Sequence, residues 1–201
     1  MIFKRKIYNE LQHWKRTDEG RTAVLIQGAR RVGKSTVAEE FATNEYDTHI
    51  LVDFAACSSE IRDLFNDVSD LNRIFMRLQL EYGIELKERK SAIIFDEVQL
   101  APKARQAIKY LVKDGRYDYI ETGSLISIRK NVKDILIPSE EVKVHMFPMD
   151  YEEFKWALGD TATIKLLQSC FHNRTSLGDA TNRKLMRDFR LYMLIGGMPQ
   201  A

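Results

Sequence analysis

The chain alternates short apolar runs with stretches in which apolar residues recur at three- and four-residue steps. The runs are typical of β-strands, and the stepped stretches are typical of amphipathic helices. Strands are predicted at residues 22–28, 49–54, 91–98, 117–124 and 141–149, and helices at 7–14, 35–46, 60–82 and 103–115. Because several strands are apolar throughout, the pattern predicts an α/β fold with helices on both faces of a mostly parallel five-stranded sheet.

Two residues are expected to mark helix ends. The helical stretch 60–82 is broken around Ser69, a good N-cap residue, so two helices in succession are predicted there. Gly115 is the expected C-cap of the helix that begins near residue 103.

The pattern changes after residue 149, where only helices are predicted, at 151–159, 164–171 and 183–195. We therefore predict a core with an N-terminal helix at 1–149 and a helical extension at 150–201. The sequence stops just after the apolar run 191–195, which is better accommodated in a packed interior than at a free end. The extension is therefore expected to lead into a further C-terminal domain.

Composition narrows the class of protein. The 201 residues are 44% hydrophobic and 30% charged, which suits one packed core of ordinary size. A net charge of +2 creates no global field that attracts DNA, RNA or anionic lipid. Because no stretch approaches roughly 18 uninterrupted apolar residues and the start lacks a signal-peptide core, we expect a cytoplasmic protein without a membrane partner. Cys57 and Cys170 stand far apart and are expected to be reduced thiols.

One segment carries an explicit chemical pattern, because GARRVGKS fits G-x-x-x-x-G-K-[ST] between a strand and a helix. The glycines let backbone N–H groups turn toward a phosphate, Lys34 is expected to reach the β- and γ-phosphates, and Ser35 to ligate Mg²⁺. Arg30 and Arg31 hold variable positions and are expected to face solvent or a following domain. The predicted nucleotide-binding residues are Gly28, Ala29, Arg30, Arg31, Val32, Gly33, Lys34, Ser35 and Thr36. The loop makes the predicted three-layer core that of a P-loop NTPase.

The third predicted strand ends in a pair of acidic residues, Asp96 and Glu97. Asp96 is expected to hold Mg²⁺ through its water shell, and Glu97 to polarise the water that attacks the γ-phosphate. An acidic pair alone is also typical of a solvated strand end, but the loop upstream favours the catalytic interpretation. The two motifs together predict ATP and Mg²⁺ as ligands and hydrolysis as the reaction.

Three more side chains are candidates, each with a plainer alternative. Ser124, at the end of the fourth strand, is placed to hydrogen-bond the water or the γ-phosphate, or simply ends a strand at a glycine turn. Gln99 orients the water or senses the γ-phosphate, or is a surface glutamine at a strand-to-helix turn. Arg129, followed by Lys130, is a charge-stabilising finger in this subunit or a neighbouring one, or part of a solvated basic turn.

The base is expected to be adenine. Residues Asn131 to Asp134 resemble a guanine-specificity motif, but in that motif Lys directly follows Asn, and here Val132 intervenes. Tyr8, Leu11 and Trp14 either cover the base or form an ordinary apolar stripe of a helix.

The chain resembles the bacterial and archaeal AAA-type ATPases whose ATPase domain precedes a C-terminal domain of unknown function. The resemblance rests on IQGARRVGKST, IIFDEVQ, ETGSLISI, MFPMDYEEF and LYMLIGGMPQA. It implies an additional-strand, catalytic-glutamate ATPase core, a helical extension and a missing C-terminal half. Many members carry a Gly-Arg pair before the fifth strand, where this chain has IPSEE at 137–141, so no arginine role is carried over there.

The leading functional hypothesis is ATP hydrolysis coupled to a conformational change that serves an unidentified protein partner, with assembly into a homo-oligomer left open. One alternative is a nucleotide-gated switch with slow turnover. Another is a DNA-associated ATPase acting through the missing region, which the near-neutral charge does not support. A small-molecule kinase is less favoured, because Asp96 and Glu97 together favour water as the nucleophile.

Overall fold

The structure is a computed structural model that describes residues 3–124 and 138–199. The chain divides into two compact units. One unit is Ile7–Met146, and the other joins the N-terminal residues up to Lys6 with the chain from Phe147 onward. The first unit carries the sheet and the second is helical.

The sheet of the first unit has five strands, all parallel, in the order β2-β3-β4-β1-β5. The strands are β1 (Ala23–Gly28), β2 (Thr48–Asp53), β3 (Ser91–Asp96), β4 (Asp118–Ser124) and β5 (Glu141–Met146). The inner strands β3 and β4 are buried at every position, and β1 at all but its last, whereas the outer strands β2 and β5 are partly exposed. This difference explains the unbroken apolar runs in β1 and β3, whereas β4 also buries the polar residues Asp118, Glu121 and Thr122.

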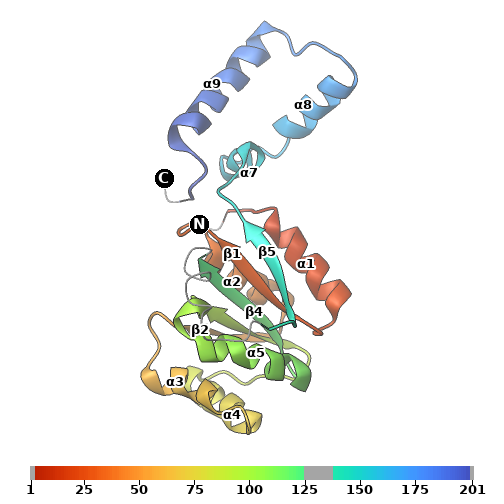
Figure 1. Cartoon of the computed structure of the whole chain (residues 1–201). Coiled ribbons are helices and arrows are strands. Elements are labelled where there is room, and N and C mark those ends of the chain that lie inside the picture. The colour runs from red at the N-terminus through yellow and green to blue at the C-terminus, as the bar shows by residue number, and fades with distance from the viewer. Residues whose placement is uncertain (1–2, 125–137, 200–201) are drawn as a thin grey trace. The chain divides into compact units, whose positions relative to one another are not determined.

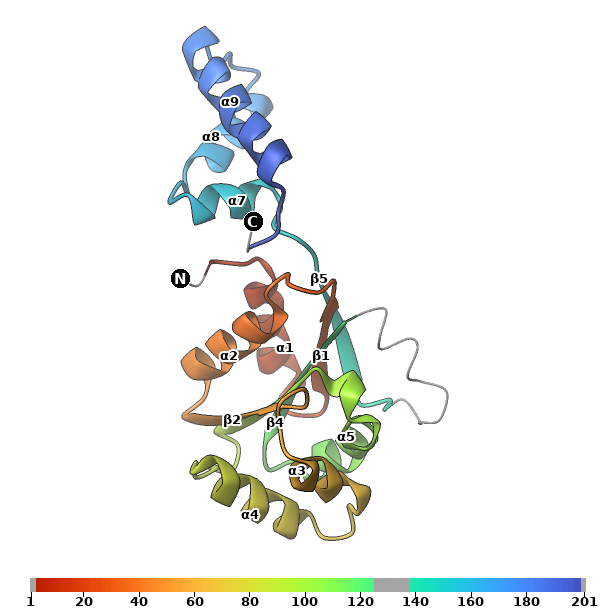
Figure 2. The same ribbon diagram turned by 90° about the vertical axis from the view of Figure 1, so that its left-hand side faces the viewer.

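Helices cover both faces of the sheet, which confirms the predicted three-layer α/β core (Figure 1). On one face lie α1 (Ile7–Asp18) and α2 (Lys34–Glu45). On the other lie α3 (Ser59–Asp63), the 3₁₀ turn η1 (Leu64–Asn66), α4 (Leu71–Tyr82) and α5 (Pro102–Asp114). Figure 2 shows the two layers of helices on opposite sides of the strands.

A hydrophobic core lies between the sheet and α3, α4 and α5. Phe54, Phe65 and Phe95 meet there with ring centroids 5.2 to 5.9 Å apart. Aromatic pairs at such separations add to the stability that burial alone provides. This face of the sheet is therefore fixed by packing between β2, β3 and the helices that connect them.

The helix ends agree with the sequence in one case and differ in another. Gly115 adopts the left-handed conformation with φ 76° at the C-cap of α5, as predicted. The prediction of Ser69 as N-cap of α4 is wrong by one residue. Asp70 is the cap, because its carboxylate accepts from the backbone N–H of Arg73, while the Ser69 N–H donates to Asp67.

The second unit contains α7 (Tyr151–Ala157), α8 (Thr163–His172) and α9 (Asp179–Ile195). A capping box begins α7, in which Asp150 accepts from the Glu153 N–H and Glu153 accepts from the Asp150 N–H. Glu153 also accepts from the backbone N–H of Lys6 at 2.6 Å and pairs with Arg5 at 3.2 Å. The chain's N-terminal segment is thereby attached to α7.

Two segments that carried the family resemblance, MFPMDYEEF and LYMLIGGMPQA, contact each other in this unit. The Met149 N–H donates to the Gly197 carbonyl at 2.7 Å, and the Tyr192 hydroxyl donates to the Met149 carbonyl. A Cβ at Gly197 would lie 2.2 Å from the Met149 oxygen, so this close backbone approach requires glycine.

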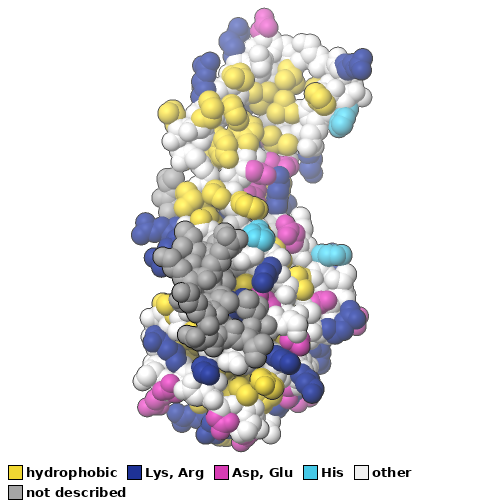
Figure 3. All heavy atoms as spheres, viewed as in Figure 1, with side chains coloured by type: hydrophobic (Ala, Val, Ile, Leu, Met, Phe, Trp, Pro, Cys, Tyr) yellow, Lys and Arg dark blue, Asp and Glu magenta, His cyan; other side chains and the backbone are white. Residues whose placement is uncertain are grey.

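The helices α8 and α9 contain no buried residue within the described part of the chain. Figure 3 shows hydrophobic side chains gathered on this unit, and the most exposed of them include Leu166, Phe171, Met193 and Leu194. None of the described helices is both long and apolar enough to span a membrane.

Candidate nucleotide-binding site

The loop GARRVGKS connects β1 to α2, and its two glycines are required by geometry. A Cβ at Gly28 would lie 2.1 Å from the carbonyl oxygen of Met146 in β5, so no side chain fits there. Gly33 is the N-cap of α2 and has φ 97°, a left-handed conformation that side chains disfavour. The two fixed glycines of the motif therefore set the path of the backbone.

The N-terminus of α2 is prepared for an anion. Among the described residues no side chain caps it, and its first turn contains no acidic residue. The first N–H groups of a helix lack intrahelical partners and carry a partial positive charge. A helix end whose own first turn carries no carboxylate is a binding site suited to phosphate.

Lys34 lies at this helix end with only 5% of its surface exposed. Its ammonium donates to the Ala29 carbonyl at 2.8 Å, so the side chain turns back over the loop. Burial lowers the pKa of Lys34, while the charges of Glu97 and Asp96 oppose that shift and Arg30 adds to it. The lysine therefore lies within electrostatic reach of the acidic pair.

Ser35 and Asp96 are in direct contact. The Ser35 hydroxyl donates to Asp96 Oδ1 at 2.7 Å, although the two residues are 61 positions apart. A hydroxyl and a carboxylate are oxygen donors of the kind that Mg²⁺ prefers. The donor set therefore fits a Mg²⁺ ion held between the loop and the end of β3.

Strand β4 lies between β1 and β3, and besides the predicted Ser124 it supplies a second hydroxyl residue, Thr122. The hydroxyl of Thr122 donates to Asp96 Oδ1, and it accepts from the backbone N–H of Glu97 at 3.2 Å. Thr122 thereby contacts both members of the acidic pair. The sequence predicted a hydroxyl residue from the end of this strand near the γ-phosphate, and the structure shows that Thr122 contacts the acidic pair.

A family comparison decides the class of this site. The model of a family described as the AAA domain matches residues 20–155, well over half of the chain. The chain belongs to the AAA domain family. The match includes the loop, the acidic pair and all five strands, and a comparison with curated proteins finds no match.

This AAA domain is also similar to solved structures, at low identity. The Aeropyrum pernix Orc1 protein in complex with DNA is 15% identical, with a TM-score of 0.46 over 81% of this chain and 50% of that one. The Thermotoga maritima RuvB Holliday junction branch migration motor is 12% identical, with a TM-score of 0.46 over 81% and 52%. C. elegans PCH-2 is 11% identical, with a TM-score of 0.43 over 84% and 49%. The chain spans about half the length of these structures.

Gln99 is buried with 3% of its surface exposed, so the alternative of a surface glutamine is wrong. It belongs to the 3₁₀ turn η2 (Val98–Leu100), which follows Glu97 directly. Its side-chain amide donates to Glu97 Oε2. Gln99 therefore contacts the residue predicted to act as the base.

Ser124 is buried, with 4% of its surface exposed, and pairs in register with Gly28 at the start of the phosphate loop. It remains a candidate for contact with the phosphates. Thr36, which completes the predicted loop set, is exposed on the first turn of α2.

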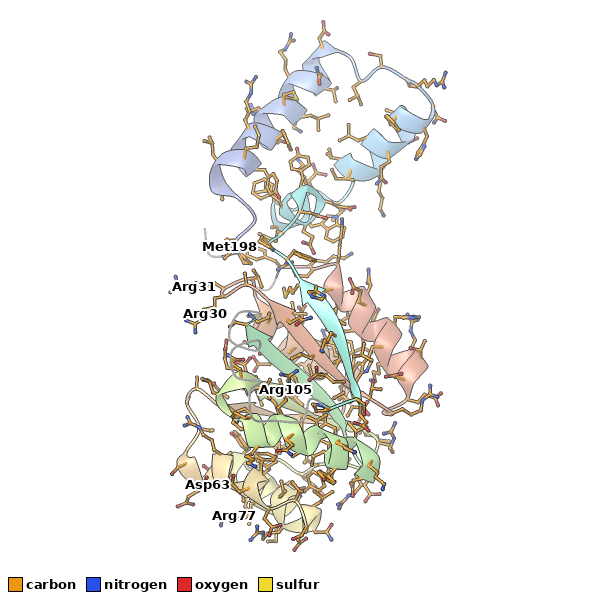
Figure 4. The ribbon with its side chains drawn as sticks, viewed as in Figure 1. Arg30, Arg31, Asp63, Arg77, Arg105 and Met198 are labelled. Atoms are coloured by element: carbon orange, nitrogen blue, oxygen red, sulfur yellow. The ribbon has the colours of Figure 1, made fainter. Side chains whose placement is uncertain are left out.

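Arg30 and Arg31 are exposed, and Figure 4 shows both side chains pointing outward from the loop. This agrees with their expected position toward solvent. Leu11 and Trp14 are buried in the core of the sheet unit, where the Trp14 indole N–H donates to Thr22. They therefore have the packing role of a helix stripe.

Other predicted residues lie outside the described part of the chain. These are Arg129 and Lys130, the segment Asn131 to Asp134, and Ile137.

Proposed function

We propose that this AAA domain binds ATP together with Mg²⁺ and hydrolyses the bond between the β- and γ-phosphates. The observation that carries the proposal is the 2.7 Å contact between the Ser35 hydroxyl and Asp96. It joins the two expected Mg²⁺ ligands at the uncapped, positive end of α2. Glu97 follows Asp96 directly, and its charge acts on Lys34, which supports a second carboxylate near the same site.

Each residue has a distinct task in the proposed reaction. The Lys34 ammonium and the N–H groups at the start of α2 bind phosphate oxygens and stabilise their negative charge. Ser35 and Asp96 hold Mg²⁺, which when bound neutralises charge on the phosphates. The Glu97 carboxylate orients the attacking water and accepts its proton. Thr122 keeps Asp96 and the Glu97 backbone at a fixed spacing.

We further propose that turnover is coupled to a conformational change that serves a protein partner, and that adenine is the base. Membership of the AAA domain family and the division of the chain into two units support this proposal. Assembly into a homo-oligomer is compatible with it, since charge-stabilising arginines are supplied by a neighbouring subunit in some ATPases.

The proposal is tested by measuring ATP affinity and phosphate release for the parent and two variants. Lys34→Ala is expected to lose at least tenfold in ATP affinity, because it removes a charge-assisted contact to phosphate. Glu97→Gln is expected to bind ATP as the parent does, but to release phosphate about 100-fold more slowly. Exposed residues on the same unit, changed as Lys109→Ala and Glu39→Gln, are the matched controls and should behave as the parent.

Equal phosphate release by Glu97→Gln and the parent would remove Glu97 from the mechanism. A single turnover without a second would favour the nucleotide-gated switch, in which binding carries the signal. Phosphate release per subunit that rises with protein concentration would support assembly.

A further inference from the structure

The turn after the acidic pair holds Glu97 from two sides. The backbone N–H of Glu97 donates to the Thr122 hydroxyl at 3.2 Å, and the side-chain amide of Gln99 donates to Glu97 Oε2. The first contact comes from β4 and the second from η2. Both the main chain and the carboxylate of Glu97 are therefore fixed by neighbouring groups.

The backbone of Glu97 makes the second contact possible. Glu97 has φ 52° and ψ 45°, in the left-handed region that residues other than glycine rarely adopt. Its carbonyl accepts from the Leu100 N–H at 2.9 Å, which closes η2. This tight turn brings side chains two positions apart into contact, which neither an extended strand nor an α-helix would do.

Burial strengthens the hydrogen bond between Gln99 and Glu97. Gln99 is almost fully removed from solvent, so water competes weakly for its amide. A glutamate side chain has several rotatable bonds and loses much conformational freedom when it is held in one arrangement. A base that is already held near its working position reacts faster than one that must first be ordered.

We propose that Gln99 is a positioning residue that orients the carboxylate of Glu97 for its role as base, an inference that rests on the proposed function. The amide of Gln99 engages Oε2, so Oε1 is the oxygen assigned to the attacking water. The proton passes from that water to Oε1 as the water oxygen forms its bond to the γ-phosphorus and the bond to the bridging oxygen of ADP breaks.

The test compares Gln99→Met with the parent full-length chain in steady-state phosphate release. Methionine has a similar length and suits a buried position, but it cannot donate a hydrogen bond. Gln99→Met is expected to lower kcat about tenfold or more and to leave the KM for ATP unchanged. Leu100→Met, in the same turn, is the matched control and should keep the parent kcat. Gln99→Asn keeps an amide and should recover part of the loss.

A double-variant comparison distinguishes positioning from a general structural effect. If Gln99 acts through Glu97, adding Gln99→Met to Glu97→Gln causes no further loss in the residual rate. The same loss in both backgrounds would overturn the proposal. A higher kcat in Gln99→Met would also overturn it, because the amide would then restrain Glu97 rather than position it.

Chemical denaturation of the same four proteins tests the contact without any turnover. The midpoints of the parent, the two single variants and the double variant should be non-additive, because the two side chains interact in the folded state. Additive midpoints overturn the proposal whatever the rates show. Absence of multiple turnover in the parent, alongside non-additive midpoints, would instead contradict the proposed function and leave the contact established.

Discussion

At the scale of single residues, the carboxyl groups of this protein fall into two kinds. Asp96 lies at a strand end with hydrogen-bond donors around it. Glu121 is fully buried in β4, and neither of its oxygens has a hydrogen-bond partner among the described residues. Burial raises the pKa of Glu121 well above its ordinary value of 4.5, Glu141 raises it further, and Arg105 opposes the shift. The folded structure therefore favours the neutral form of the Glu121 carboxyl group.

This difference gives a prediction for stability against pH. Below about pH 4.5 Glu121 is protonated in both the folded and the unfolded state, so burying it does not cost ionisation energy. As the pH rises above 4.5, the carboxyl group ionises in the unfolded state first, and the unfolding free energy of the parent falls until the pH reaches the folded pKa. Glu121→Gln has nearly the same shape and does not titrate. As the pH rises above about 4.5 toward the folded pKa, the variant should gain unfolding free energy over the parent, by at most about 1.4 kcal/mol per pH unit.

Urea unfolding at a series of pH values measures this gain. Exposed Glu88, changed to glutamine, is the control and should give a curve parallel to the parent. Parallel curves for Glu121→Gln as well would show that Glu121 is ionised in the folded protein.

At the scale of elements, helix α5 and strand β5 are joined by a buried ion pair. The Arg105 guanidinium donates to both oxygens of Glu141 at 3.0 Å, and the two side chains are 3% and 0% exposed. Figure 4 shows Arg105 extending from α5. Because β1 is the one strand that pairs with β5 within residues 3–124 and 138–199, this contact is a second attachment for an edge strand.

Removing the arginine should therefore destabilise the sheet unit. Arg105→Met leaves the Glu141 carboxylate buried without its main partner, which typically costs about 3 to 5 kcal/mol. Lys143, 3.7 Å from Glu141, offsets part of that cost, so about 3 kcal/mol is expected in urea unfolding. Lys109→Ala on the exposed face of α5 should change stability by less than about 0.5 kcal/mol. A similarly small effect of Arg105→Met would mean that the pair contributes little.

At the scale of the whole molecule, the sheet unit carries the phosphate loop and the acidic pair. In the helical unit, Glu153, Lys155 and Met149 make hydrogen bonds or ion pairs that join segments distant in the chain. Lys155 is buried and pairs with Asp160 at 2.9 Å and Asp188 at 2.8 Å. Each unit has its own stabilising contacts. A ligand that binds only the loop should therefore stabilise the sheet unit first.

Thermal unfolding with MgATP tests this expectation. At about 100 times the dissociation constant, binding should add about 2.7 kcal/mol to the unfolding free energy of the sheet unit and raise its Tm. Removing Mg²⁺ with a chelator, or the charge with Lys34→Ala, should reduce the shift. Lys109→Ala should keep it. An equal shift in Lys34→Ala would place the nucleotide elsewhere.

The sequence by itself determined the five strands, the helices between them and the identity of the loop. These features are local, because strand and helix periodicity and the glycine requirements of a phosphate loop depend on neighbouring residues. The same local pattern predicted that Asp96 and Glu97 end a strand. It placed the cap of α4 only to within one residue, because Ser69 and Asp70 are both good caps and the surrounding turn decided between them.

The sequence also predicted that the loop and the acidic pair share one Mg²⁺ site, but the tertiary structure alone decided which further side chains contact them. Strand order depends on pairing between segments that are distant in the chain, and the hydrophobic pattern of each segment does not show which strand it pairs with. That order inserts β4 between β1 and β3 and brings Thr122 to the acidic pair. The burial of Gln99 likewise follows from packing around η2, so its contact with Glu97 could not be read from the sequence.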